Sequence, residues 1–337
     1  MFLLLAAVLS QPTALYEFDR QDGTVELVLA LAGDGLDQLG SPSYSPDEQS
    51  IAIDATKDND WNECRIIIWN RDAESLTDVG QGNYPVWTSD NAAVVYSTFY
   101  GSRSLRLSPV DPDGKTTDLG LKRYNPELSP DGAYVLTSSV GNSTKAENVR
   151  VAPLDRLDAE PFTLDLEIGS FPEFAHQPGD SPSAIATLVA TSRRSERNPS
   201  AILAIDISGS DPSDPATWTA TPRELLAANK TYRGPDLPSP ATTTDAVAFR
   251  YTRAGGGLAV GVLQQDRPGE VVTVLAAPKG VRLEALRMSS SGRYICFKSD
   301  LFHLGPIDGR LLEPADLLAR PAAADSSPAD SNTSETP

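Results

Sequence analysis

Oxygen-bearing side chains crowd one short segment of the sequence, Asp58-Asn59-Asp60-Trp61-Asn62-Glu63. Carboxylate and amide oxygens are the ligands that Ca²⁺ takes in proteins. The candidate cation ligands are Asp58, Asp60, Asn62 and Glu63. Their spacing is not that of an EF-hand, because the sixth position holds no glycine and Trp69 stands where the closing glutamate belongs. The segment is therefore predicted to be a solvated acidic loop, with a calcium site as the alternative.

Three further segments match catalytic or binding motifs only in part. Gly179-Asp180-Ser181-Pro182-Ser183 begins like the G-x-S-x-G of a serine hydrolase but ends in serine, so a turn is predicted. The run Gly255–Gly261 has Val260 where the G-x-G-x-x-G motif needs its last glycine, and a hairpin loop is predicted. The basic cluster Arg193–Arg197 is predicted to be a solvated loop tip, and contact with an acidic partner is the alternative.

The chain contains two histidines and two cysteines. His176 and His303 are predicted to be a turn residue and a strand residue rather than metal ligands, because zinc sites gather three or four ligand side chains. Cys64 and Cys296 each lie beside apolar residues, and we expect two buried, unpaired thiols. A disulfide that closes the two ends of an exported chain is the alternative. No catalytic, cofactor-binding or metal-binding residue is predicted, and no cofactor.

The charge balance excludes several classes of partner. The 337 residues include 28 Lys and Arg against 46 Asp and Glu, a net charge of −18. Nucleic-acid binding needs Lys and Arg to replace the counterions of the phosphates, so no nucleic-acid partner is expected. Anionic membrane surfaces are disfavoured for the same reason. The apolar run Phe2–Leu9 is shorter than the roughly 20 residues of a membrane-spanning helix, so no stable membrane span is expected.

The two ends differ in composition from the middle. Residues 1–14 contain the apolar run and then small residues, and are predicted to be a signal peptide, which would make the protein periplasmic or secreted. A buried first strand is the alternative. Residues 314–337 are predicted to form a short helix and then a disordered acidic tail. From Arg320 onward, no large apolar side chain offsets the entropy of ordering the tail.

A short pattern recurs between these ends: proline, any residue, a large apolar residue, and then turn residues followed by an apolar run. Pro42–Asp47, Pro85–Asp90 and Pro126–Gly132 are its clearest copies. The large apolar positions are Tyr44, Trp87, Leu128, Phe174, Leu237 and Met288. Most of their intervals are close to the period of a four-stranded propeller blade, so six copies predict six blades.

Each copy has the chemistry of a β-hairpin. In Ser129-Pro130-Asp131-Gly132, proline pre-sets φ at the second turn position and glycine suits the fourth. Third strands are predicted at Arg65–Trp69, Leu105–Val110, Val149–Leu154, Ile202–Ile207 and Leu258–Leu263. Fourth strands are predicted at segments such as Phe162–Leu166 and Val271–Leu275. Thr221-Pro222-Arg223-Glu224 matches a helix capping box, so a short helix is predicted at the end of the fourth blade.

The two ends of the repeat region complement one another. Leu15–Asp19 and Thr24–Ala30 are predicted to be a third and a fourth strand without a first pair, whereas the copy at Met288 has a first pair. Joining them in one blade closes the ring and leaves no sheet edge open between blades. Leu301–Leu304 competes with Leu15–Asp19 for the third-strand position, so two-plus-two and three-plus-one closures both stay open.

The element P-x-aromatic-S-P-D-G before an apolar strand resembles the TolB-like, or WD40-like (PD40-type), β-propeller repeat, from about Leu15 to Gly309. The resemblance implies an all-β fold: a six-bladed β-propeller of four-stranded blades over residues 15–313, closed by joining the N- and C-terminal strands. Propellers of this kind bind proteins in the periplasmic Tol–Pal system, accompany the catalytic domain of oligopeptidases, or act as pectin-degrading lyases. The lyases bind a metal through several histidines, whereas this chain has two, and no oligopeptidase α/β domain is recognised in the sequence.

The function predicted from the sequence is that of a non-enzymatic, exported propeller serving as a protein–protein interaction scaffold in the cell envelope. Other envelope proteins are the expected partners, at a face or channel mouth where loops gather on a rigid frame. The alternative is a carbohydrate-binding or carbohydrate-active propeller, with a glycan or small molecule in the channel against Trp61, Trp87 or Tyr100. Trp87 occupies a repeat core position and is expected to be buried. A purely structural ring is the third hypothesis.

Overall fold

The structure is a computed structural model. It describes residues 14–300 except for 31–35, 37, 59, 99–103, 112, 121–124, 142–144, 167, 169–171, 178–182 and 193–199. The predictions for residues 1–13, for Leu301–Leu304 and for the C-terminal helix and tail therefore lie outside the described residues. Ala14, the last residue of the predicted signal peptide, is the first residue of a buried strand.

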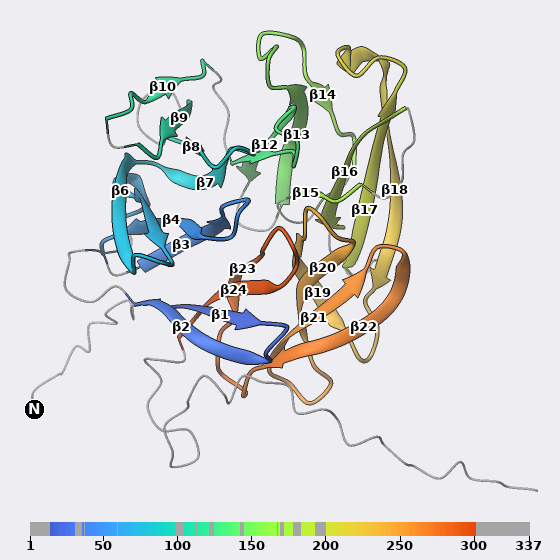
Figure 1. The fold of residues 1–337 in the computed structure, drawn as a ribbon. Coiled ribbons are helices and arrows are strands. Elements are labelled where there is room, and N and C mark those ends of the chain that lie inside the picture. Colours follow the sequence, from blue (N-terminus) through green and yellow to red (C-terminus); the bar gives the residue numbers. More distant parts are fainter. Residues whose placement is uncertain are drawn as a thin grey trace, which may run out of the picture.

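Six four-stranded antiparallel sheets follow one another around a central axis (Figure 1). Blade one contains β3 (Gln38–Tyr44), β4 (Ser50–Thr56), β5 (Arg65–Asn70) and β6 (Ser75–Gln81). Blade two contains β7 (Asn83–Trp87), β8 (Ala93–Ser97), β9 (Leu105–Pro109) and β10 (Thr117–Asp118). Blade three contains β11 (Pro126–Leu128), β12 (Tyr134–Gly141), β13 (Lys145–Pro153) and β14 (Phe162–Thr163). These sheets confirm the predicted all-β propeller.

The other three blades complete the ring. Blade four contains β15 (Glu173–Ala175), β16 (Ala184–Thr191), β17 (Ala201–Gly209) and β18 (Trp218–Ala227). Blade five contains β19 (Arg233–Pro240), β20 (Ala246–Thr252), β21 (Leu258–Gln264) and β22 (Arg267–Ala276). Blade six combines β23 (Glu284–Met288) and β24 (Tyr294–Ser299) with β1 (Ala14–Asp19) and β2 (Thr24–Ala30). Two single-turn 3-10 helices, Trp61–Glu63 and Pro215–Thr217, lie in loops.

The first strands of the blades surround the axis. Each of β3, β7, β11, β15, β19 and β23 contacts the first strand of the next blade, and β23 contacts β3 to complete the circle. The apolar positions of the repeat pack between blades: Trp87 is buried, and its indole Nε1 donates to the carbonyl of Ser43 in blade one at 3.1 Å. The inner strands therefore form the wall of a central channel.

The closure of the ring is two-plus-two. Strand β1 pairs with β24 over its whole length, from Ala14 opposite Ser299 to Asp19 opposite Tyr294. The guanidinium of Arg293 binds the Asp19 carboxylate, with Nη2 at 2.6 Å from Oδ2. The N-terminal strands thus supply the third and fourth strands of blade six, as one of the two predicted closures requires.

Repeated side-chain hydrogen bonds explain the turn residues of the repeat. In blades one to three, a Ser or Thr hydroxyl donates to an Asp carboxylate two residues later, at 2.6 Å in each blade: Ser45 to Asp47, Thr88 to Asp90, and Ser129 to Asp131. The same hydroxyl accepts the N–H five residues later, at the start of the second strand. This internal network fixes the hairpin register and is local in sequence.

Two sequence predictions are wrong. The segment from Thr221 is part of strand β18 and not a helix, because Trp218–Ala227 pairs with β17 while Leu225 and Leu226 are buried between blades. Pro222 is tolerated because β18 is an outer edge strand, where a missing N–H breaks no ladder. In blade five the repeat position is Pro240, which pairs with Val247, and not Leu237.

Cys64 and Cys296 are free and buried, as expected, and no disulfide joins them. Burial raises the pKa of the Cys64 thiol to about 12 and that of Cys296 well above its ordinary value. Both sulfurs are therefore protonated and unreactive at neutral pH. Within the described part of the chain, no helix has the length and apolar character needed to cross a bilayer.

Candidate binding site in the central channel

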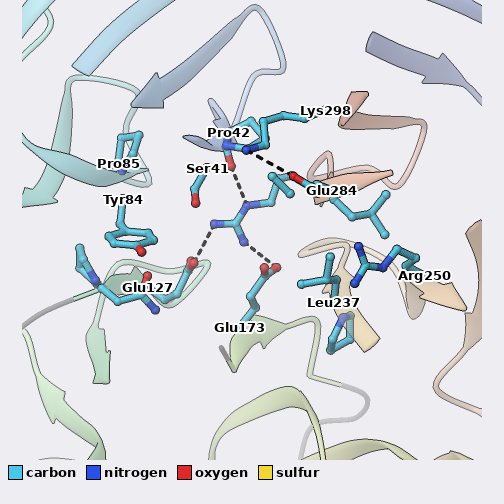
Figure 2. A pocket seen from close by; sticks show the side chains of 16 residues that line it. Ser41, Pro42, Tyr84, Pro85, Glu127, Glu173, Leu237, Arg250, Glu284 and Lys298 are labelled. Atoms are coloured by element: carbon cyan, nitrogen blue, oxygen red, sulfur yellow. Dashed lines mark hydrogen bonds and ion pairs between the residues drawn. The ribbon is translucent and has the colours of Figure 1, made fainter. Parts of the chain in front are cut away.

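A cavity of about 400 Å³ opens where the first strands begin, and all six of these strands contribute to its wall (Figure 2). Its lining combines apolar residues with charged groups. Among the lining residues are Pro42, Tyr84, Glu127, Glu173, Leu237, Arg250, Glu284, Arg287 and Lys298. A mixed lining of this kind suits a ligand that has both apolar and charged groups.

Proline and left-handed backbone shape part of the cavity wall. Three blades place a residue with positive φ directly before a lining proline: Tyr84 (φ 53°) before Pro85, Asn125 (φ 50°) before Pro126, and Leu237 (φ 47°) before Pro238. In blades two and five the register of the inner strand shifts at this point, which marks a β-bulge. Proline fits here because an inner strand is a sheet edge, where its missing N–H leaves no pairing partner unsatisfied.

A charged cluster crosses the channel at mid-depth. Arg287 of β23 binds Glu127 of β11 (Nη2 to Oε1, 2.7 Å) and Glu173 of β15 (Nη1 to Oε2, 2.5 Å). Its Nε also donates to the carbonyl of Pro42 in β3 at 3.2 Å. The hydroxyl of Ser239 in β19 donates to Glu173 Oε2 at 2.8 Å. The cluster therefore links five of the six blades across the axis.

Burial sets the charge state of this cluster. Removal from water raises the pKa of Glu173 to about 7, against the attraction of Arg287, and the charge of Glu127 adds to the rise. Burial also raises the pKa of Glu127. Burial alone would lower the pKa of Arg287, but the two carboxylates raise it above its ordinary value. The guanidinium is therefore a permanent cation, whereas Glu173 titrates near neutral pH.

A second cavity of about 270 Å³ opens on the opposite face, among the hairpin turns, and is lined by residues such as Pro46, Ser89 and Ser290. Three residues of the charged cluster line both cavities: Glu127, Glu173 and Arg287. The cluster therefore lies between the two cavities. We call the larger cavity the wide vestibule.

Further ion pairs hold the wall of the wide vestibule. Arg250 binds the carboxylate of Asp236 through two nitrogens, at 2.7 and 2.8 Å, and donates to the carbonyl of Leu283 at 2.7 Å. Lys298 donates to the carbonyl of Leu39 at 2.7 Å. Burial lowers the pKa of Lys298 and raises that of the neighbouring Asp54 carboxyl. These contacts come from several blades and fix the shape of the wall.

The predicted cation candidates do not line either channel cavity. Asp60 caps the short helix Trp61–Glu63 by accepting from the backbone N–H of Asn62 at 3.1 Å. Glu63 closes the same turn, and Asp58 precedes it with φ of 52°. Among the residues that the structure describes, no three His, Cys, Asp or Glu side chains gather as a metal site would require.

His176, Gly256, Gly257 and Trp61, which the sequence also singled out, do not line either cavity. His176 directly follows β15, and its carbonyl accepts from Gln265 Nε2 at 3.1 Å. Gly256 and Gly257 form a tight turn with φ of 82° and 85° before β21. Trp61 is half-buried in its short helix, and the buried Trp87 borders the smaller cavity. Residues 178–182, the cluster Arg193–Arg197, Tyr100 and His303 lie outside the described residues.

Sequence reasoning missed the charged cluster, although a signal was present. Glu127, Glu173 and Arg287 each stand directly before the large apolar position of their repeat. Blades one and two have Ser43 and Val86 at that place. A charged residue in the middle of an inner strand points at neighbouring inner strands, so alignment of the six copies would have indicated a shared polar centre.

The fold and the channel together define a six-bladed β-propeller with four-stranded blades. Its structure is similar to that of a protein from Agrobacterium tumefaciens assigned as TolB, with a TM-score of 0.58 and 15% identity over 86% of this chain and 98% of that one. It is also similar to an oligogalacturonate lyase from Vibrio parahaemolyticus, with a TM-score of 0.51 and 9% identity over 83% and 76% of the two chains.

At these identities the similarity concerns the fold, which is TolB-like. Neither protein-family models nor curated protein sequences give a significant match to the chain.

Proposed function

We propose that this protein is a non-enzymatic propeller that acts as a protein–protein interaction scaffold in the cell envelope after export. The wide vestibule is the proposed contact site. The observation that carries the proposal is that all six inner strands form its wall and that the Arg287 cluster crosses the channel at its inner end. A segment that projects from another protein can enter such an opening and meet a rigid wall.

The mixture of apolar and charged residues in the lining supports a macromolecular ligand. Prolines, Leu237 and the ring of Tyr84 line the cavity together with the ion pairs. Interfaces commonly combine apolar contacts with a few placed charges that fix orientation. The predicted signal peptide at residues 1–14 supports action outside the cytoplasm, and the similarity of the fold to TolB is in keeping with a binding role.

A carbohydrate ligand is the second candidate function. The observation in its favour is that an aromatic ring, that of Tyr84, lines the wide vestibule beside carboxylates. Sugar rings stack on aromatic faces and hydrogen-bond to carboxylates. Binding of a glycan panel to the purified protein, lost in Tyr84→Ala, would support this candidate over the first.

Affinity capture from an envelope extract of the source organism tests the scaffold. Wild-type protein on beads is compared with Ala285→Arg, which projects a long side chain from the vestibule wall, and with Thr77→Arg on the exposed outer strand β6. Ala285 already holds a φ of 47°, so a side chain is accommodated there. We expect one or two stoichiometric proteins with wild type and Thr77→Arg, reduced about tenfold with Ala285→Arg. Identical capture by all three proteins, or none above blank beads, would overturn the proposal.

A further inference from the structure

The cations of the wide vestibule are all committed to partners within the protein. Arg250 is held by Asp236 and Leu283, and Lys298 by the carbonyl of Leu39. Arg287 is shared between two carboxylates. Each of these cations is thus held within the protein by contacts of 2.5 to 2.7 Å.

The carboxylates of the same cavity are less well satisfied. Glu127 contacts Arg287 through Oε1 only, and Glu173 receives both of its contacts on Oε2. The other oxygen of each carboxylate has no hydrogen-bond partner among the residues that the structure describes. Neither oxygen is among the fully buried, unpartnered side-chain atoms of the described chain. Both therefore face open space in the channel.

A third carboxylate adds to this acidic surface. Glu284 is 40% exposed and lies 3.8 Å from Arg282 Nη1 and 4.0 Å from Lys298 Nζ, both longer than a hydrogen bond. Figure 2 shows Glu284 beside Lys298, with Glu127 and Glu173 across the opening. Three carboxylates, Glu127, Glu173 and Glu284, and three cations line this cavity, and one of the cations, Arg250, is neutralised by Asp236, which lies outside the lining. The wide vestibule therefore lacks one positive charge.

We propose that the wide vestibule receives one basic side chain, lysine or arginine, at the tip of the partner segment, and that Glu127, Glu173 and Glu284 bind its charged head. This inference rests on the proposed scaffold function and names the chemistry of its partner. The prolines and Leu237 of the lining offer apolar contacts to the aliphatic stem of such a side chain while the head reaches the carboxylates. The net charge of −18 steers basic partners toward the molecule.

A metal ion fits this site less well than a basic side chain does. Arg287 already lies between the two deep carboxylates, at 2.5 and 2.7 Å, and its fixed charge repels a divalent ion placed beside them. A lysine or arginine head carries a single charge and several N–H donors, which match the two open oxygens. The geometry therefore favours an organic cation.

The titration of Glu173 predicts how the binding of a basic side chain depends on pH. Its pKa of about 7 means that it is ionised above this pH and neutral below it. The charged groups that face it are Arg287 and Glu127, with Ser239 as a neutral donor. Arg250, Lys298 and Glu284 complete the charged lining. Because the acidic form loses the attracting charge, binding of a basic side chain weakens as the pH falls from 8 to 6.

Fluorescence anisotropy with short peptides tests the proposal. The probe is the capped pentapeptide Gly-Ser-Lys-Ser-Gly with a neutral dye, and its counterparts carry arginine or Nε-acetyl-lysine at the centre. At about 0.15 M salt, which screens the long-range attraction, we expect the charged peptides to bind about tenfold more tightly than the acetylated one. Equal affinity of the lysine and acetyl-lysine peptides for wild-type protein would overturn the proposal.

Matched variants separate the site from general acidity. Glu127→Gln with Glu173→Gln should abolish the preference for lysine, and the milder Glu284→Gln should weaken binding at least threefold. Glu26→Gln with Glu74→Gln removes the same charge from exposed outer positions and should change nothing. A preference for lysine that survives in Glu284→Gln and in the Glu127→Gln, Glu173→Gln double variant would overturn the proposal.

The capture experiment separates this inference from the scaffold function. If beads carrying the double variant still capture the envelope partner and only Ala285→Arg loses it, the inference fails while the scaffold function stands.

Discussion

Arg287 concentrates the interactions of the channel in one side chain. It binds two carboxylates and one carbonyl from three other blades, and its side chain is 15% exposed. Buried ion clusters add little net stability when complete, because desolvation offsets the attraction between the charges. Removal of one member is costly, since the remaining charges stay buried without a partner. The side chain therefore specifies the arrangement of the inner strands more than it stabilises them.

We predict that Arg287→Met lowers the free energy of unfolding by about 3–5 kcal/mol at pH 8, because Glu127 and Glu173 lose their shared cation. Chemical denaturation monitored by fluorescence measures this. Combining Arg287→Met with Glu127→Gln and Glu173→Gln removes the uncompensated charges and should restore much of the loss. A cost below about 1 kcal/mol for the single variant would show that water already solvates the carboxylates.

The destabilisation caused by Arg287→Met should decrease as the pH falls. Glu173 has a pKa of about 7 in the folded protein against an ordinary value of 4.5, so the folded state binds more protons between these pH values. Its titration therefore stabilises the fold as the pH falls from 7 toward 4.5, and this gain is absent at pH 8. The cost of Arg287→Met should accordingly be smaller at pH 5 than at pH 8, whereas Glu173→Gln should remove this part of the pH dependence.

At the scale of the elements, glycine permits the close approach of one blade to the next. Gly82 lies between β6 and β7, and its N–H donates to the carbonyl of Cys64 at 2.9 Å. A Cβ at this position would lie 2.2 Å from Cδ2 of Tyr96, a buried ring, and 3.0 Å from the carbonyl of Ser97. The passage from blade one to blade two thus depends on a residue without a side chain.

We predict that Gly82→Ala destabilises the protein by about 1–3 kcal/mol through overpacking against Tyr96. Gly255→Ala is the matched control, because a Cβ at Gly255 meets nothing within 4 Å and neither glycine has a left-handed φ. That control should be neutral or slightly stabilising. Thermal unfolding of both variants compares them, and equal shifts in the melting temperature would contradict the packing argument.

The elements also show what local sequence can predict. The hairpins were predictable because the Ser-Pro-Asp turn fixes its own register through hydrogen bonds within five residues. Strand β18 was missed because a capping-box pattern at Thr221 is local, whereas its pairing with β17 and the burial of Leu225 are decided by tertiary contacts. The repeat position of blade five was also misplaced, because the register shift between Asp236 and Ser239 puts Pro240 there and not Leu237.

The candidate site was less predictable than the fold. Arg287 lies 160 residues from Glu127 in the sequence, and no spacing rule relates two residues that meet only because the ring closes. The predicted cation loop was recognisable by composition, yet Asp60 uses its carboxylate to cap a turn. The functional chemistry of a propeller channel depends on residues contributed singly by different blades, which composition and periodicity do not reveal.

At the scale of the whole molecule, the closing blade is tied to blade one by a buried ion pair. Glu17 of β1 binds Arg71 through both oxygens, at 2.8 and 2.9 Å, and accepts from the hydroxyl of Tyr44 at 2.6 Å. Arg71 also lies over the rings of Trp69 and Tyr294, at 5.5 and 4.7 Å from their centroids. The contact joins three parts of the chain at the seam of the ring.

We predict that Glu17→Ala destabilises the protein by about 2–3 kcal/mol, because it leaves Arg71 and Tyr44 without their shared acceptor. Asp78→Ala is the control: it breaks the Arg65–Asp78 pair, in which both side chains are nearly half exposed, and should cost less than about 1 kcal/mol. Urea unfolding measures both. A control as costly as Glu17→Ala would argue against a special role for the seam.

The pairing of β1 with β24 also governs the order of folding. Ala14 and Ser299 are neighbours in space but belong to opposite ends of the described chain. During synthesis, β1 and β2 emerge first and cannot complete their sheet until β24 has been made, so Leu15, Tyr16 and Phe18 stay without their final cover while the other blades form. Contacts between such distant residues form slowly, and the waiting strand exposes an unpaired edge. Ring closure is therefore the expected slow step, and the interval before it is when the nascent chain depends most on protection from aggregation.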